Sequence, residues 1–523
     1  MKAIKKNYFY YFFLLILPLI VSFYTNNFFL KNFEIQLWFR GLDELVFIYN
    51  ALIINNGFQQ EYLDHTSFFL ILLLSILFKV LYLFSIIDIS TIGQLNASIV
   101  LEKDLNEIYF VARLFICTIS SLFTFIVFKI TRLISGDDFV AFLMSVIFFF
   151  STGNITNLNI IDSPHLSALF LFLSFYSLLI FLNNTKNNIL YLCLFFIFAY
   201  SSILQKIQSF IFIIPVFCSA MFLTKKSKDL EISFLRISSF RNEYYYTIII
   251  FITLLIIIKS IIIYRSIESA LFLIGNYYLI NYLFFLYSRT YLKKTVKNLI
   301  VFNIILIVSY VFLKIVLTFH PGLNLEIFNI SFGKIIKNIS AFATEQKISQ
   351  TSGIINFIII FINNFMENFI FVLKKNILQI NYQSLLFFFT LLLLIINFKN
   401  IKSNKIKLNV FLLIIFYFFS QTINSFRERM HYEIYSELFL IICCALIYRY
   451  SNNKKITKLF IITSLIFLVI QSLKIIEINK IHNNDRREEC VKIINDTNNM
   501  NAYISIWTPK INKNIFKNSC GEF

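Results

Sequence analysis

The chain has 523 residues, of which 58% are hydrophobic and 18% aromatic, with only 10 Gly and 5 Pro. Its mean hydropathy is +0.75, and apolar runs long enough to span ~30 Å of hydrocarbon recur along it. The net charge of +19 would suggest a nucleic-acid partner in a soluble protein. Here the positive residues lie in short loops, where they act as topology determinants. The composition therefore excludes a soluble domain and predicts an all-α polytopic membrane protein that binds no nucleic acid.

The N-terminus begins with Lys2, Lys5 and Lys6, followed by an apolar run at 8–25 without a small-residue cleavage site. These lysines predict a cytoplasmic N-terminus under the positive-inside rule. The segment that follows the first helix is therefore expected outside.

The apolar run 68–87, interrupted by Lys79, decides the topology of the rest. If it crosses the membrane once, the later clusters of Lys and Arg face outward; if it lies in the interface or crosses twice, they face the cytoplasm. These clusters lie at 129–132, 225–241 and 293–297. The positive-inside rule favours the second case, so we interpret 68–87 as an outer juxtamembrane helix. The first outer loop then extends over 26–107.

If the Lys and Arg clusters face the cytoplasm, the later apolar runs cross the membrane in alternating directions. This predicts about thirteen transmembrane helices in all. After the first helix they are expected at 108–130, 138–152, 165–182, 189–204, 208–224, 246–264, 269–288, 298–319, 384–398, 408–424, 433–450 and 457–475. A second long outer loop covers 320–382, and its apolar part, 354–373, is interpreted as interfacial because it contains polar and acidic residues. One transmembrane domain thus covers 1–476, and 477–523 form a small outer tail.

The sequence lacks the motifs of several common kinds of chemistry. No spacing resembles a zinc site, no Gly-rich phosphate loop indicates nucleotide-driven transport, and no nucleophile elbow appears. Five of the seven Cys lie in apolar segments, where packing is their expected role. Cys490 and Cys520 lie in the outer tail, where an oxidising compartment would allow a disulfide, and their pairing is left open.

The rare charged residues of the apolar regions converge on the outer face under this topology. Acidic candidates are Asp43 and Glu44 after the first helix and Asp162 in the short loop 159–165. Basic candidates are Arg113, Lys206, Arg427, Arg429 and His431. A carboxylate can act as general base on an acceptor hydroxyl or amine, and Arg and Lys can hold a departing phosphate. Transfer of a sugar from a lipid phosphate requires both groups at a membrane-embedded site.

Each candidate has a structural alternative. Arg113, Lys206 and Arg427 could snorkel to the lipid headgroups. Asp162 could cap the helix that continues with Pro164, and His65 could be a structural histidine. A solvated loop is the alternative for Asp43 and Glu44.

The order of these motifs resembles the C superfamily of lipid-phosphate-sugar-dependent glycosyltransferases, which contains the protein O-mannosyltransferases and the aminoarabinose transferases. The resemblance is carried by Gly41-Leu42-Asp43-Glu44, Asp64-His65-Thr66, Ala112-Arg113-Leu114, Asp162, Gln205-Lys206 and Arg429-Met430-His431-Tyr432. The first loop keeps the family's His but lacks its two prolines. The match extends over roughly 9–222 and more loosely to 450.

The resemblance implies a role for each matching residue. Asp43 would be the catalytic base, with Glu44 beside it and Asp162 assisting. The donor phosphate would contact Arg113, Lys206, Arg429 and His431, with Arg427 added from the residue pattern alone. Other substrate contacts would come from Asp64, His65 and Tyr432. Metal use varies in the superfamily, so we name no metal ligand and leave a divalent cation open.

The function implied is an inverting glycosyltransferase of the bacterial inner membrane, with its active site and C-terminus in the periplasm. The donor would be a monosaccharide linked to polyprenyl phosphate, and the acceptor a cell-envelope glycan, lipid or protein. Three alternatives stay open: a polymerase or ligase acting on lipid-diphosphate glycans, a flippase or transporter of lipid-linked sugars, and a non-catalytic scaffold. The absence of an evident internal repeat weakens the transporter.

Overall fold

The computed structural model describes residues 8–22, 42–61, 67–98, 101–158, 160–183, 189–223, 253, 267–291, 295–318, 322–323, 354–401, 404–425, 430–495 and 510. The regular structure in these ranges is helical, which confirms the predicted all-α class. In the first third of the chain, the helix Tyr8–Ser22 precedes α2 (Leu42–Asn55), α3 (Phe68–Leu83), α4 (Ile92–Ala97), α5 (Leu101–Ser135), α6 (Asp138–Phe149) and α7 (Thr152–Leu158).

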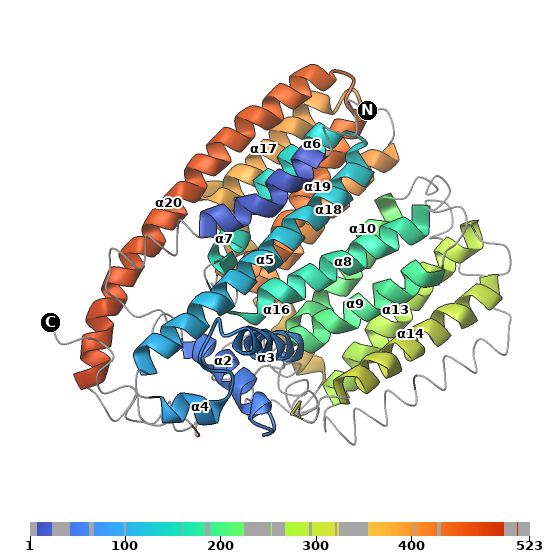
Figure 1. Ribbon diagram of the computed structural model, residues 1–523. Coiled ribbons are helices and arrows are strands. Elements are labelled where there is room, and N and C mark those ends of the chain that lie inside the picture. The colour runs from blue at the N-terminus through green and yellow to red at the C-terminus, as the bar shows by residue number, and fades with distance from the viewer. Residues whose placement is uncertain are drawn as a thin grey trace.

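The middle of the chain contributes α8 (Ser163–Asn183), α9 (Ile189–Gln205), the short 3-10 helix η2 (Ile207–Ser209), α10 (Phe210–Leu223), α13 (Ile267–Tyr291) and α14 (Thr295–Thr318). The last part contributes α16 (Ile354–Leu378), α17 (Tyr382–Asn397), α18 (Asn404–Ser425), the 3-10 helix η6 (Met430–Glu433), α19 (Ile434–Tyr450) and α20 (Lys454–Asn495). Most of these helices run in similar directions in one bundle (Figure 1).

Five helical segments among the described residues are long and apolar enough to cross a membrane: Lys103–Ser135, Ser163–Asn183, Lys297–Thr318, Ile406–Ile423 and Lys454–Lys474. Two bent pairs raise the number to seven if each pair is one span. Exposed apolar side chains on the outer helices, such as Val308 and Phe312 on α14 and Phe467 on α20, suit contact with lipid. The chain is a multi-pass membrane protein, and the number of thirteen spans stays a prediction.

The two bent pairs were not expected as such from the sequence. The predicted span 138–152 covers α6 and only the first residue of α7, which continues to Leu158 and meets α6 at an angle of 60°. The second pair, Phe365–Leu378 with Tyr382–Asn397, is bent by 79°, and Asn381 caps α17 with its side chain. The sharp bend turns α16 away from the axis of α17, and the interfacial interpretation of 354–373 stays a prediction.

The orientation of α3 differs from that of the long helices. α3 is seen end-on in Figure 1, while α5 and α8 run across the view. One face of α3 is buried through Phe68, Leu74 and Phe78, and Val80 and Leu83 expose apolar side chains near its end. α3 is thus a short apolar helix with one packed face, and its place at the membrane interface stays a prediction.

Two helices are longer than a membrane requires. α5 has 35 residues and α20 has 42, which correspond to roughly 52 and 63 Å at 1.5 Å per residue. The start of α5 and the end of α20 project beyond the bundle on the same side, near α4 (Figure 1). The first loop and the C-terminal tail therefore share one end of the molecule.

Candidate functional site

The start of α2 is fixed by a buried ion pair. Glu44 is 1% exposed and Arg113 of α5 is 0% exposed. Arg113 Nη2 donates to Glu44 Oε2 at 2.7 Å, and the Ile161 N–H donates to Glu44 Oε1 at 2.7 Å. Both oxygens of Glu44 are thus engaged, so this carboxylate positions its surroundings more readily than it accepts a proton from a substrate. Glu44 brings the start of α2 beside the loop before α8.

Asp162 follows Ile161 in that loop and begins α8. Its Oδ1 accepts hydrogen bonds from the Ser163 N–H at 2.6 Å and from Ser163 Oγ at 3.2 Å. These contacts are to the next residue and not to the second or third N–H of α8 that a capping side chain binds, so the capping role of Asp162 stays an alternative. The hydrogen bond from the Ile161 N–H to Glu44 thus brings together two backbone positions, 43 and 162, that each carry an acid.

Gln205 joins this loop to α3 and α9. Its main-chain oxygen accepts the Ser67 N–H at 3.2 Å, and its Oε1 accepts the Leu70 N–H at 3.0 Å. Its Nε2 donates to the Ser163 main-chain oxygen at 3.5 Å. One side chain at the end of α9 therefore links the N-termini of α3 and α8.

Lys206, the next residue, is 2% exposed, and its Nζ lies 5.5 Å from the centroid of the Tyr432 ring. Tyr432 belongs to η6, which leads into α19. The Tyr435 hydroxyl of α19 donates to the Pro164 main-chain oxygen at 3.2 Å. The predicted residues Asp162, Lys206 and Tyr432 are thus brought together from three distant parts of the chain.

Two buried acids near this site were not predicted. Glu433 accepts from Lys375 Nζ of α16 at 3.4 Å. Glu437 is fully buried and accepts the Gly153 N–H at 3.2 Å and Gln383 Nε2 at 3.3 Å. Their position at the start of an otherwise apolar run could have indicated them. Burying an acid in such a run is costly, so an acid found there is usually functional or paired.

Gly153 permits a close approach between α7 and the junction of η6 and α19. A Cβ atom at this position would lie 2.2 Å from the Ile434 nitrogen and 2.6 Å from its Cα. Only a residue without a side chain allows α7 to pack against the junction of η6 and α19.

Several predicted residues are not described in full. Asp64, His65, Arg427 and Arg429 lie outside the described residues, and the side chains of Asp43 and His431 lie outside them as well. Asp43 is the second residue of α2 and directly precedes Glu44. Its backbone position is therefore known through its neighbour.

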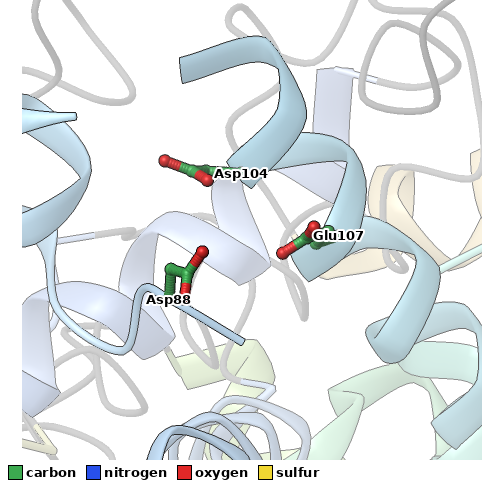
Figure 2. Close-up of side chains that lie close together, drawn as sticks. All are labelled: Asp88, Asp104 and Glu107. Atoms are coloured by element: carbon green, nitrogen blue, oxygen red, sulfur yellow. The ribbon is translucent and has the colours of Figure 1, made fainter. Parts of the chain in front are cut away.

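A second acidic group lies at the start of α5. Figure 2 shows Asp88, from the segment between α3 and α4, facing Asp104 and Glu107 of α5, and one oxygen from each lies within 4.8 Å of the others. Carboxylate oxygens are ligands for Mg²⁺, Ca²⁺ or Mn²⁺. Ser98 Oγ donates to Asp104, and Lys103 Nζ lies 3.7 Å from Glu107. These three acids are the group of described residues best able to hold a divalent cation, but acids at a surface also gather without one.

The fold and site define a multi-pass helical membrane protein with buried ionic groups at one end of its bundle. None of the protein-family models, curated proteins and solved structures compared with the chain matches it. The functional argument therefore depends on the site itself.

Proposed function

We propose that this protein is a membrane glycosyltransferase that transfers a monosaccharide from a polyprenyl-phosphate donor to a cell-envelope acceptor at the periplasmic face. The observation that carries the proposal is the bond of Glu44 to both Arg113 and the Ile161 N–H. It holds the Asp43 position of α2 against the Asp162 loop, although 119 residues separate these acids in the sequence.

Asp43 is the general base in this proposal. Its carboxylate takes the proton of the acceptor hydroxyl or amine as the acceptor atom attacks the anomeric carbon. The bond from that carbon to the phosphate oxygen breaks, and its electron pair leaves with the lipid phosphate, so the configuration inverts. Asp162 assists beside it by orienting the acceptor.

Glu44 and Arg113 act as a positioning pair. Arg113 is fully buried against Glu44, which favours this role over the direct phosphate contact that we predicted from the sequence. Lys206 is the described cation best suited to the departing phosphate, since it is a point charge next to the Asp162 loop. Arg427, Arg429 and His431 stay candidates for the remaining phosphate contacts.

The test is transfer from a radiolabelled polyprenyl-phosphate sugar to a competent acceptor in membranes. We expect Asp43→Asn to lower the rate by at least about a hundredfold, since a positioned general base contributes 10²–10⁴. Glu367→Gln, which changes an exposed acid of α16, is the matched control and should transfer at the wild-type rate. Wild-type transfer by Asp43→Asn at equal protein levels would remove Asp43 from the role of base.

A further inference from the structure

We propose that the N-termini of α3 and α10, with Lys206 between them, bind the monophosphate of the lipid-linked donor, and that the hydroxyls of Ser67 and Ser209 contact it directly. The choice of lipid rests on the proposed function. The anion site itself rests on the geometry of this turn, which Gln205 holds in place.

Ser67 is the N-cap residue of α3, but its side chain does not cap the helix. It has φ = 39°, in the left-handed region that a residue with a side chain seldom adopts. Its hydroxyl is fully buried and has no hydrogen-bond partner among the described residues. A strained serine with an unsatisfied hydroxyl at a helix N-terminus is typical of a ligand contact.

Ser209 is the last residue of η2 and directly precedes α10. Its N–H donates to the Lys206 main-chain oxygen at 3.0 Å, which closes the turn between α9 and α10. Its hydroxyl is also fully buried, and no described residue forms a hydrogen bond with it. Two N-terminal serines with unsatisfied hydroxyls thus flank Lys206.

The two N-termini are held together by the residue before Lys206. The Gln205 main-chain oxygen accepts the Ser67 N–H at 3.2 Å, and Gln205 Oε1 accepts the Leu70 N–H at 3.0 Å. The N-terminus of α3 is therefore bonded to Gln205, the residue before Lys206. α10 begins four residues after Lys206 in the sequence.

The charges and donors of this turn select a tetrahedral oxyanion. Helix N-termini carry partial positive charge and bind phosphate through their N–H groups, and the buried ammonium of Lys206 adds a full charge. The neighbouring N-terminus of α8 carries the carboxylate of Asp162, which bonds the Ser163 N–H and would repel a second anion, so we assign the anion to α3 and α10. Exposed apolar residues near the end of α3, such as Val80 and Leu83, suit a ligand whose tail stays in the membrane.

The test is the binding of polyprenyl monophosphate to the purified full-length protein in detergent micelles, without sugar or acceptor. We expect the double variant Ser67→Ala/Ser209→Ala to bind it about tenfold more weakly, as lost hydrogen bonds to a charged group predict. Ser219→Ala is the matched control, because Ser219 is a buried serine of the same α10 whose hydroxyl also lacks a described partner. This control should bind within about twofold of the wild type.

Three competitors identify the ligand. Polyprenol of the same chain length should compete poorly, which shows that the phosphate is needed. Inorganic phosphate should compete weakly, which shows that the tail contributes. Phosphatidic acid competing as well as the polyprenyl phosphate would assign the site to a phospholipid headgroup and overturn the proposal.

Folding controls keep the result interpretable. Removing an unsatisfied hydroxyl leaves no new buried group unpaired, so both alanine variants should keep the wild-type Tm. Ser67→Gly, which relaxes the left-handed residue, should weaken binding similarly. Wild-type affinity in the double variant, with or without transfer activity, overturns the phosphate site. Asp43→Asn should still bind the lipid, so failure of the proposed reaction and failure of this site are distinguishable.

Discussion

Glu44, for which the sequence allowed a solvated loop, is buried in the structure. Its partner Arg113 lies 69 residues away and is fully buried. Removing one member of such a pair leaves the other charge buried and uncompensated, which costs about 3–5 kcal/mol.

Arg113→Met should therefore lower the Tm clearly in detergent, whereas Glu44→Gln/Arg113→Met should recover part of the loss because no lone charge remains. Thermal unfolding of the purified variants measures this. Lys103→Ala is the control, since its pair with Glu107 is solvent-exposed and should contribute less than about 1 kcal/mol. An equal, small shift for Arg113→Met and Lys103→Ala would contradict the buried pair.

Gly153 offers a second prediction at the residue scale. Gly153→Ala places a Cβ 2.2 Å from the Ile434 nitrogen and 2.6 Å from its Cα. Both contacted atoms belong to backbone that cannot yield without moving α7 or α19. We expect destabilisation of about 1–3 kcal/mol or more, measured as a lower Tm. Gly275→Ala on α13 is the matched control, because its Cβ would meet no atom within 4 Å. It should be neutral or stabilise by up to about 1 kcal/mol.

At the scale of the elements, the junction of α5 and α6 predicts a pH-dependent stability of the fold. Asp137 caps α6 through the Phe139 and Val140 N–H groups, and it accepts from Tyr448 at 2.7 Å and from Lys458 at 2.7 Å. Partial burial acts to raise the pKa of Asp137, but the bonds from Lys458, Tyr448 and Val140 outweigh it and lower this pKa.

Because its folded pKa is lowered, Asp137 stabilises the fold above its unfolded pKa of about 3.9, and this contribution is lost as the pH falls through the folded value. The wild type should lose thermal stability below about pH 4, and part of this loss should disappear in Asp137→Asn, which keeps a capping side chain. Unfolding scans between neutral and acidic pH measure the difference. An identical pH profile for both proteins would contradict the assignment.

At the scale of the whole molecule, Lys510 near the C-terminus contacts the first outer loop. The Lys510 main-chain oxygen accepts from Asn96 Nδ2 at 2.7 Å, and the Lys510 N–H donates to the Tyr49 hydroxyl at 3.3 Å. Lys510 also pairs with Glu61, to which Tyr49 donates. Burial raises the pKa of Tyr49 to about 12, so its hydroxyl stays protonated as this donor. The tail thus contacts α2, the helix that carries Asp43.

This contact predicts a shared side of the membrane. Asn96→Cys and Lys510→Cys, each introduced where the native cysteines have been replaced, should both react with a membrane-impermeant maleimide added from the periplasmic side. The double variant should be joined by a short bifunctional reagent. Labelling from opposite sides would contradict both the contact and the proposed topology.

Much of the architecture could be predicted because hydropathy and the Lys and Arg pattern act locally. The apolar runs predicted the long apolar helices, and the interfacial place of 68–87, which was predicted from the Lys and Arg pattern, stays a prediction. The sequence predicted that the span containing α6 ends near 152, but it did not predict that a separate helix, α7, follows at 60° to α6. A local pattern gives no direction to a short polar helix, because that direction depends on packing.

The sequence by itself determined that this chain is an all-α membrane protein with rare acids and bases at identifiable positions. Only the tertiary structure decided their partners: Glu44 with Arg113, Gln205 with the N-termini of α3 and α8, and Glu437 with Gly153. The physical reason is that helical periodicity fixes only which face a residue occupies, over a few turns. Pairing across tens or hundreds of residues depends on how helices pack, and there the cost of burying each charge selects the partner.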